Sequence, residues 1–318
     1  MRTLKISAVW LVILFLCLGC QQDSPELIRL GTNVWPGYEP FYLAREQGYY
    51  KEINLRLVEY SSASEVIRAF KNENLEAAAL TLDEAIYLSQ SHPDIMVVLV
   101  TDISNGGDVI ISKENIENVN GLHGKRVAVE SNALGAYFIT RALETHQMNL
   151  EDISLVHLEV SAHEEAFLQG RVDAAVTFEP VKTKLIAAGG KEIFSSRQIP
   201  NEIVDVLVIH KRNDLLTKRR KTLQKIMTGW FKALDDLKNS PQESANIISK
   251  RLKITPEQAL ASYDGLILPT LGENRRLLSG GQGSLVGNIE KLSAVMLEHN
   301  LLKRKPEGSN LISEELLP

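Results

Sequence analysis

The sequence predicts an α/β protein of two lobes, with the second lobe inserted into the first and a helical region at the C-terminal end. Three patterns lead to this prediction. Strand-like and helix-like segments alternate from residue 27 to residue 209, which is typical of mostly parallel sheets. The alternation restarts after a loop at 104–107 that contains two glycines. Beyond Asp214 the apolar residues recur with a helical period and almost no strand signal.

The expected elements follow from these patterns. Strands of the first lobe are expected at 27–34, 54–60, 76–81 and 95–103, and helices at 39–50, 64–71 and 82–91. The fourth strand has the continuous apolar run of a strand that is buried on both faces. Strands of the second lobe are expected at 108–112, 126–130, 154–160, 173–178 and 192–195, and helices at 133–146, 162–169 and 181–188. A last strand at 203–209 precedes helices at 215–238, 241–252, 256–266 and 286–301.

This order of elements predicts how the chain is divided. One strand leads out of the first lobe and one leads back, so we expect residues 29–106 and 206–318 to form lobe one and residues 107–205 to form lobe two. Crossings at 104–109 and 203–208 would act as a hinge that lets the lobes close on a ligand. About 290 residues follow the N-terminal segment, which is enough for two modest cores.

The first 19 residues have the pattern of a secretory signal peptide. Arg2 and Lys5 precede an apolar run from 8 to 18, which is shorter than the roughly 20 residues that a membrane-spanning helix needs. The end of this run, Leu16-Cys17-Leu18-Gly19-Cys20, resembles the lipobox of bacterial lipoproteins, although Cys17 stands where leucine is preferred. The resemblance implies cleavage before Cys20, lipid on its sulfur and a polar tether over 20–28. An uncleaved anchor and a soluble secreted product are the alternatives.

Composition excludes several classes of function. Cleavage before Cys20 leaves no cysteine in 21–318, which excludes a disulfide scaffold, a cysteine-ligated metal and a cysteine nucleophile. Removing Arg2 and Lys5 changes the formal charge from −5 to −7, and an acidic chain without a basic stripe does not suit nucleic acid. Neither a nucleophile elbow nor a phosphate-binding loop occurs, and the histidines lack metal-ligand spacing. We therefore expect no catalytic residue, metal or cofactor.

Ligands of open α/β sheets bind beyond the carboxyl ends of the strands, so the loops after each strand supply the candidate contacts. The candidates are Trp35, Tyr38, Ser61, Thr81, Asp83, Asp108, Glu130, Ser131, Asn132 and Glu179. Rings, hydroxyls, an amide and carboxylates together suit a small polar molecule. Core packing is the alternative for Trp35 and Tyr38, and helix capping is the alternative for Asp83 and Glu179.

The charges near these loops predict the sign of the ligand. No lysine or arginine lies between 34 and 40, 61 and 64, 81 and 84, or 130 and 135. Anionic ligands usually bind to arginine or to a cluster of free N–H groups. We therefore expect a neutral or cationic ligand, such as an amine or a pyrimidine-like ring that stacks on Trp35 or Tyr38.

Three segments resemble a known family. Residues 31–50, which begin Gly31-Thr32-Asn33-Val34-Trp35-Pro36-Gly37-Tyr38, resemble the opening of substrate-binding proteins for nitrate, taurine, alkanesulfonates and thiamine-precursor pyrimidines. Residues 124–129 and 170–180 are similar to that family's second-lobe strand and to its "DA…EP" segment, and the likeness extends from about 28 to 240.

The resemblance implies the type-2 periplasmic binding fold and a solute-binding subunit of an ABC importer, with a permease and an ATPase as partners. With lipid on Cys20, the protein would be anchored on the periplasmic side of a bacterial membrane or at the cell surface, and we expect a monomer. A ligand-sensing lipoprotein that reports to a membrane sensor is an alternative. A thiamine-pyrimidine biosynthesis enzyme is less favoured, because the enzymes that resemble this family depend on a cysteine-rich motif that is absent here.

Overall fold

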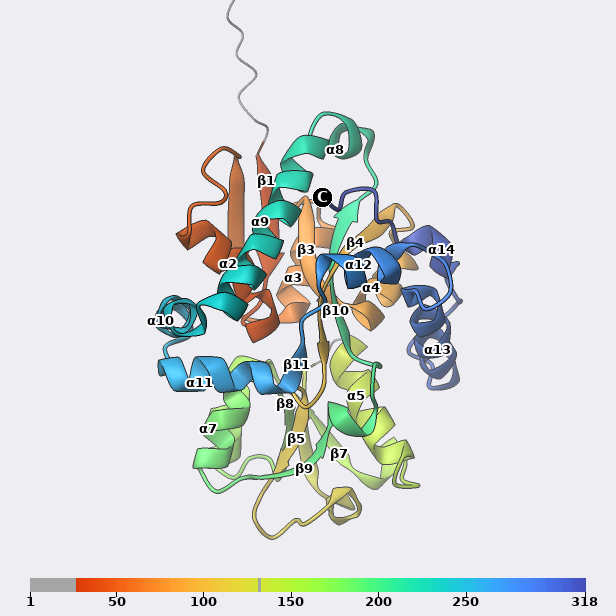
Figure 1. The fold of residues 1–318 in the computed structure, drawn as a ribbon. Coiled ribbons are helices and arrows are strands. Elements are labelled where there is room, and N and C mark those ends of the chain that lie inside the picture. The colour runs from red at the N-terminus through yellow and green to blue at the C-terminus, as the bar shows by residue number, and fades with distance from the viewer. Residues whose placement is uncertain (1–26, 131–132) are drawn as a thin grey trace, which may run out of the picture.

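The computed structural model describes residues 27–130 and 133–318 and folds them into two α/β lobes (Figure 1). In Figure 1, lobe one lies at the top and contains both ends of the described chain, whereas lobe two, coloured yellow to green, lies below it. The candidates Cys20, Ser131 and Asn132 lie outside the described residues. No helix in the described part of the chain is long and apolar enough to cross a membrane.

Lobe one is built on a six-stranded sheet in the order β11-β4-β10-β3-β1-β2. Its strands are β1 (Ile28–Thr32), β2 (Leu55–Glu59), β3 (Ala77–Thr81), β4 (Ile95–Ser104), β10 (Val204–His210) and β11 (Leu266–Ile267). Strand β1 pairs in parallel with β2 and β3, while β10 runs antiparallel between β3 and β4. Because β10 is reversed, its first residues lie at the same edge of the sheet as the carboxyl ends of β3 and β4.

Helices pack around this sheet. They are α2 (Glu39–Glu46), α3 (Ala63–Lys71), α4 (Leu82–Ser89), α8 (Asn213–Thr217), α9 (Arg220–Asn239), α10 (Pro241–Leu252), α11 (Pro256–Ala261), α12 (Leu271–Leu278), α13 (Leu285–Glu298) and α14 (Gly308–Leu311). Short 3₁₀ turns lie at Pro36–Tyr38 and Ser262–Gly265. Helix α3 shows why a helix begins where it does in this sequence. The Ser62 hydroxyl accepts the N–H of Glu65 and so caps the first turn.

Lobe two is built on a five-stranded sheet in the order β7-β6-β8-β5-β9. Its strands are β5 (Val109–Ser112), β6 (Arg126–Val129), β7 (Ser154–His157), β8 (Ala174–Thr177) and β9 (Lys191–Ser195). Its helices are α5 (Ala133–Glu144), α6 (His163–Leu168) and α7 (Val181–Ala187), with 3₁₀ turns at Val119–Leu122, Leu150–Asp152, Val160–Ala162 and Ser196–Gln198. The carboxyl ends of the parallel strands β6, β7 and β8 share one edge of this sheet.

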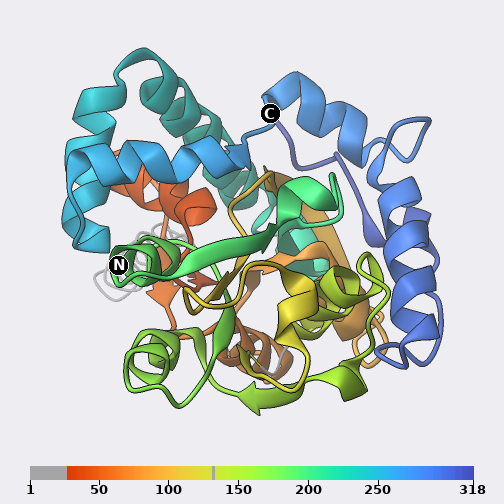
Figure 2. The same cartoon turned by 90° about the horizontal axis from the view of Figure 1, so that it is seen from below.

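The region beyond Asp214 is largely helical, as predicted, but three details differ. The single helix expected at 215–238 is two helices, α8 and α9, and neither α12 nor α14 was predicted. The helix expected at 256–266 is wrong beyond Ala261, because the chain turns there and Leu266–Ile267 pairs with β4. Gly265 allows this, since a Cβ on it would lie 2.7 Å from the Gly107 nitrogen. Figure 2 shows the C-terminal helices on two sides of the molecule, teal to light blue on one and dark blue on the other.

The chain passes between the two sheets twice, which confirms the predicted two-lobed architecture with two crossings. It leaves the first sheet at Ser104 and returns at Val204. The two crossing segments are bonded to each other, because the Ser104 N–H donates to the Ile203 carbonyl at 3.0 Å. The first crossing is also bonded to the 3₁₀ turn after β9, where the Ser196 hydroxyl lies 2.8 Å from that of Ser104 and accepts the Gly106 N–H at 2.6 Å. The crossings therefore form one connected unit at the base of the space between the lobes.

Candidate functional site

A small cavity lies between the lobes, at the strand edges described above. Its volume is about 20 Å³, which is room for little more than one water molecule. Residues of both lobes line it: Asn33, Trp35, Tyr38, Ala63, Thr81, Glu84, Asp108, Leu134, Phe178 and Asp205. A larger occupant of this cavity therefore requires its walls to move apart.

Aromatic rings from both lobes form one wall of this cavity. Trp35 and Tyr38 flank the 3₁₀ turn after β1, where Pro36 presets the turn. Phe178, which follows β8 in lobe two, meets Trp35 edge to face with 5.4 Å between ring centroids and an interplanar angle of 88°. This is a favourable aromatic geometry, and it joins the lobes directly across the cavity.

Carboxyl groups are the second main feature of the site. Glu84, Asp108 and Asp205 line the cavity, while Asp83 and Asp102 lie beside it, and all five residues are at most 4% exposed. No lysine or arginine among the described residues lines the cavity. Lys182 lowers the pKa of Asp108, but its ammonium donates to the Gly106 carbonyl at 2.9 Å and pairs with Glu192 at 3.2 Å. The cavity is therefore acidic, with no cation of its own.

Several oxygen atoms here have no hydrogen-bond partner in the described part of the chain. They are Thr81 Oγ1, Asp83 Oδ1 and Oδ2, Glu84 Oε1, Asp102 Oδ1 and Asp108 Oδ2. Buried polar atoms are nearly always bonded, and leaving one unpaired costs about 1–3 kcal/mol, with more for a charged group. A concentration of unpaired acceptors beside one cavity suits a ligand that brings hydrogen-bond donors.

Burial changes the pKa values of these acids. It raises the pKa of Asp83 and of Asp102 to about 7 and that of Asp108 to about 6, and charge repulsion from Asp108 adds to the effect on the first two. Burial, with repulsion from neighbouring carboxyls, also raises the pKa of Glu84 and of Asp205 well above the usual range. Some of these groups therefore carry protons near neutral pH.

The structure brings four of the predicted contacts to the cavity, namely Trp35, Tyr38, Thr81 and Asp108. The other described candidates do not line it. The Ser61 hydroxyl donates to Glu65 at the surface, and Glu179 Oε2 accepts the Thr183 N–H in the first turn of α7. Asp83 points beside the cavity, where its charge acts on Asp108 and Tyr137.

Glu130 faces lobe one from the end of a lobe-two strand, as predicted, but it does not line this cavity. Its Oε1 accepts the N–H and the hydroxyl of Ser64, at 3.0 Å and 2.9 Å. Glu130 follows β6 in lobe two, whereas Ser64 lies in the first turn of α3 in lobe one. The carboxylate thus interacts with a helix N-terminus across the gap between the lobes, a position that favours negative charge.

Sequence reasoning missed six lining residues: Asn33, Ala63, Glu84, Leu134, Phe178 and Asp205. A signal existed for two of them. Asp205 interrupts the apolar strand 203–209, and Phe178 directly follows a strand, as ligand contacts commonly do. Glu84 adjoins the candidate Asp83, and only the rotation of α4 decides which of the two acids faces the cavity.

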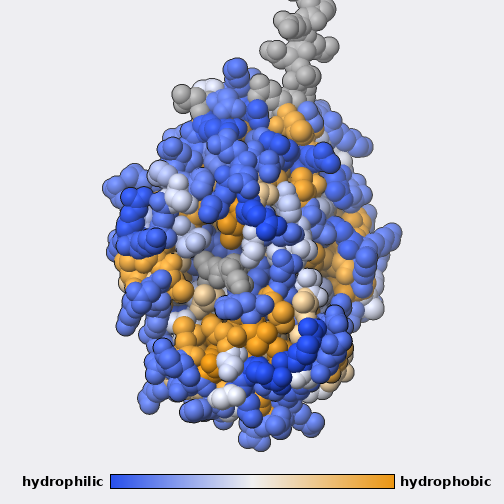
Figure 3. Space-filling view, turned by 180° about the vertical axis from the view of Figure 1, so that it is seen from behind, coloured by the Kyte–Doolittle hydropathy of each residue, from blue (hydrophilic) through white to orange (hydrophobic). Residues whose placement is uncertain are grey.

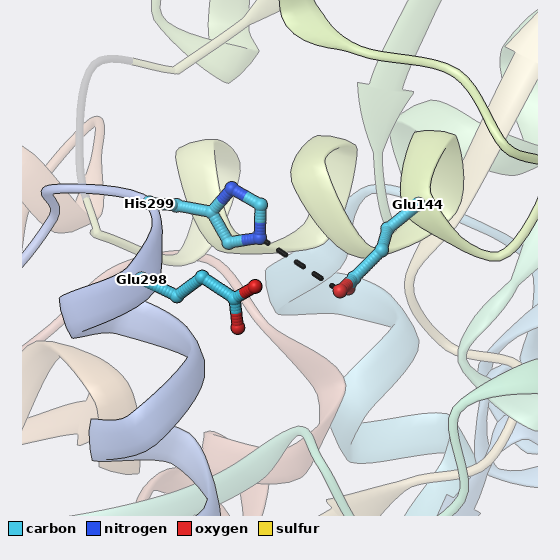
Figure 4. Close-up of side chains that lie close together, drawn as sticks. All are labelled: Glu144, Glu298 and His299. Carbon is cyan, nitrogen blue, oxygen red and sulfur yellow. Dashed lines mark ion pairs between the residues drawn. The ribbon is translucent and has the colours of Figure 1, made fainter.

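A tighter group of possible metal ligands lies elsewhere. Glu144, Glu298 and His299 are the one set of three in the described part of the chain whose ligand atoms lie within 4.8 Å of one another (Figure 4). The His299 ring lies 3.9 Å from Glu144, and Glu144 also pairs with Arg141, which competes with a metal ion. The cavity carboxyls are more widely spread than a metal ion requires, so they suit a larger cation.

A two-lobed α/β fold with two crossings and a cavity between the lobes defines a protein of the periplasmic binding class. A profile of the NMT1-like family matches residues 21–253, and this chain belongs to that family. The predicted resemblance to substrate-binding proteins of ABC importers is thereby confirmed.

Sequence relatives support the same class. The chain is 22% identical, over 248 residues, to a protein of Escherichia coli (strain K12) named for the binding of aliphatic sulfonates, and the match covers 76% of each chain. A Bacillus subtilis (strain 168) protein of the same name is 22% identical over 185 residues, which cover 54% of this chain and 56% of the relative.

Solved structures show the same fold. The alkanesulfonate-binding protein SsuA of Xanthomonas axonopodis pv. citri, bound to MOPS, has a TM-score of 0.74 at 15% identity and covers 93% of this chain and 99% of its own. SsuA of Escherichia coli has a TM-score of 0.73 at 18% identity and covers 92% and 99%. The desulfurization enzyme DszB has a TM-score of 0.64 at 13% identity, with 91% and 97% covered. The fold is therefore used by binding proteins and by at least one enzyme.

The buried acids predict how stability depends on pH. Their folded-state pKa values exceed the unfolded value of about 4, so the folded state binds more protons between about pH 4 and pH 7. The contribution of these acids to the unfolding free energy is fully present below about pH 4 and is lost as the pH rises through 6 to 7. We expect the unfolding free energy of the ligand-free protein to fall between pH 5 and pH 8, and Asp83→Asn to reduce this fall by roughly 1–4 kcal/mol.

Urea unfolding of residues 21–318 at both pH values measures this difference. Burial lowers the pKa of His163 to about 4, so His163 makes the unfolding free energy rise with pH below about pH 6.5. Because this effect is opposite to that of the acids, each variant is compared with its parent. Asp94→Asn changes an exposed aspartate and is the matched control. Equal pH dependence in Asp83→Asn and the parent would contradict a raised pKa at this position.

Proposed function

We propose that this chain is the lipid-anchored solute-binding subunit of an ABC importer, and that its solute is a small cation with N–H donors. The observation that carries the proposal is the cavity between the lobes, which is lined by three buried carboxyl groups and by no lysine or arginine of the described chain. The membership of the NMT1-like family supports the transport role.

Electrostatics argue against a sulfonate in this cavity. A sulfonate oxygen about 4 Å from one ionised carboxylate would be repelled by roughly 4 kcal/mol at an effective dielectric constant of 20. That energy corresponds to nearly three orders of magnitude in affinity. The sulfonate-binding relatives therefore indicate the fold and the transport class of this chain and leave its ligand open.

The unpaired acceptors narrow the class of cation. A quaternary ammonium carries charge but no N–H, so it would leave Asp108 Oδ2 and Glu84 Oε1 without donors. A primary ammonium, an amidinium or a protonated aminopyrimidine can satisfy them. The rings of Trp35 and Phe178 add a surface for a planar cation.

Two alternatives differ in what else the chain would do. A sensing lipoprotein needs the same cavity, so the cavity does not distinguish sensing from import. The neighbouring genes do: permease and ATPase genes favour import, whereas a lone sensor kinase or cyclase gene favours sensing. An enzyme is supported by the likeness to DszB. Against it, the described chain contains no cysteine, whereas the enzymes that resemble this family depend on a cysteine-rich motif.

We expect N–H-bearing cations to stabilise the protein and anions not to. A thermal-shift assay of residues 21–318 at pH 8, above the raised pKa of Asp108, compares methylammonium and acetamidinium with tetramethylammonium, ethanesulfonate and nitrate. A compound that binds only the folded state must raise the melting temperature. In calorimetry, Asp108→Asn should weaken the best cation by about tenfold or more, since a charge-assisted hydrogen bond contributes about 1.5–3 kcal/mol.

Asp94→Asn, an exposed change, should leave affinity unaltered. Saturable stabilisation by ethanesulfonate or nitrate, with none by the cations, would sink the proposal.

We also propose that residues 104–109 and 203–208 form the hinge between lobe one (29–106 and 206–318) and lobe two (107–205). Opening is needed because the cavity holds only about 20 Å³. Small-angle X-ray scattering should therefore give a smaller radius of gyration with the best cation of the thermal-shift panel than without it. Identical scattering profiles at saturation would exclude closure on the ligand.

The anchor is tested separately. We expect Cys20→Ser to move the protein from the membrane fraction to the soluble fraction, because stable attachment needs more than one acyl chain and lipidation of Cys20 would supply them. Immunoblots of both fractions measure this, with Cys17→Ser as the neighbouring control. Retention of Cys20→Ser in the membrane fraction would show that lipid on this cysteine is not the anchor.

A further inference from the structure

Two acids behind the aromatic wall face each other in a way that the ligand-binding role does not explain. Asp102 of β4 and Asp205 of β10 are directly opposite in the antiparallel ladder, and both are buried. Residues paired in this way point to the same face with about 5 Å between their Cβ atoms. The two carboxyl groups are close enough for one to donate a hydrogen bond to the other when it is protonated.

Each acid of this pair holds one ring of the cavity wall. The Trp35 indole N–H donates to Asp102 Oδ2 at 3.1 Å, and the Tyr38 hydroxyl donates to Asp205 Oδ1 at 2.5 Å. Gly37, between the two rings, is needed for this contact. A Cβ on Gly37 would lie 1.8 Å from Asp102 Oδ2, so any other residue would push the acid away from the indole.

The surroundings require the pair to hold a proton. The titratable groups that act on it are all acidic or phenolic: Tyr38, Glu84, Asp108 and Tyr263. No lysine or arginine of the described chain is among them. Two adjacent carboxylates without a cation cannot both be ionised near neutral pH, so they share one proton. One negative charge then remains, and the N–H of Trp35 and the O–H of Tyr38 stabilise it.

We propose that Asp102 and Asp205 are positioning residues that share one proton and, through it, hold the rings of Trp35 and Tyr38 against the cavity. Loss of that proton leaves two facing charges, which separate and release the indole. The two acids lie on the strands that lead to both crossings, so the wall is attached to the same strands that connect the lobes. The inference rests on the proposed function only in treating this cavity as the ligand site.

The test needs no ligand, so its outcome is independent of the ligand's charge. Cleavage before Cys20 leaves two tryptophans, Trp35 and Trp230, and in Trp230→Phe the emission reports Trp35 alone. We expect an emission shift between pH 5 and pH 9 in this background. Asp102→Asn supplies a fixed N–H donor in place of the shared proton, so it should abolish the shift and keep the emission seen at low pH. Asp102→Ala should alter the emission at every pH.

Two controls separate the pair from other acids. Asp94→Asn should leave the pH dependence of the Trp35 emission unchanged. Asp108→Asn should keep this pH dependence but lower its midpoint, because Asp108 only repels the pair. Trp230 is fully buried, so if Trp230→Phe does not fold, ¹⁹F NMR of the 5-fluorotryptophan-labelled parent resolves both residues without that change. A titration of Trp35 that persists in Asp102→Asn, or its absence in the parent, would overturn the proposal.

Discussion

The site between the lobes depends on one constraint, which is that buried carboxyl groups need a neutralising charge. Glu84, Asp108 and Asp205 line the cavity, with Asp83 and Asp102 beside them, and no described lysine or arginine lies among them. Ionising even one buried carboxylate without a partner costs several kcal/mol, which is a large share of a protein's whole stability. Protons can neutralise the cluster in the free protein and a cationic solute can do so in the complex. Ligand binding and proton release are therefore linked by the same groups.

The contacts that close the lobes are of a different kind. Trp35 meets Phe178, and Glu130 bonds Ser64, so ring packing and a carboxylate at a helix N-terminus connect the lobes on either side of the acids. A further connection lies near the second crossing, where Glu202 of lobe two pairs with Lys291 of α13 in lobe one at 2.8 Å. Bonds from Arg141, Lys291 and Tyr137 hold the pKa of Glu202 down to about 2 despite burial. Among the described residues, charged pairs such as this one lie outside the cavity, which no lysine or arginine lines. Figure 3 shows the rear surface, which is mostly hydrophilic, with hydrophobic residues gathered over lobe two.

The fold was predictable because its signals are local. Apolar runs, capping residues and turn glycines gave the order of strands and helices and both crossings. Strand β11 could not be predicted in the same way, because a strand of two residues is too short to show an alternating pattern of apolar residues. Its pairing also depends on the close approach of Gly265 to the first crossing.

The site was predictable mainly where the chain leaves a parallel strand. Trp35, Tyr38 and Thr81 follow that rule and line the cavity, whereas Asp108, which also lines it, was predicted from its place near the hinge. Asp205 does not follow the rule, because β10 is antiparallel and brings its first residues to the edge where β3 and β4 end. Such a reversal is a property of the assembled sheet and has no mark in the local sequence.

The cavity acids are proposed to bind the solute through its positive charge. A crystal structure of residues 21–318 with the cation that most stabilises the protein would show whether they do. We expect a ligand nitrogen within hydrogen-bond distance of carboxylate oxygens from at least two of Glu84, Asp108 and Asp205, with a ring of the wall against the ligand. A solute held by backbone N–H groups with its anionic end in this cavity, or bound outside it, would show that these acids do not bind the solute through its charge.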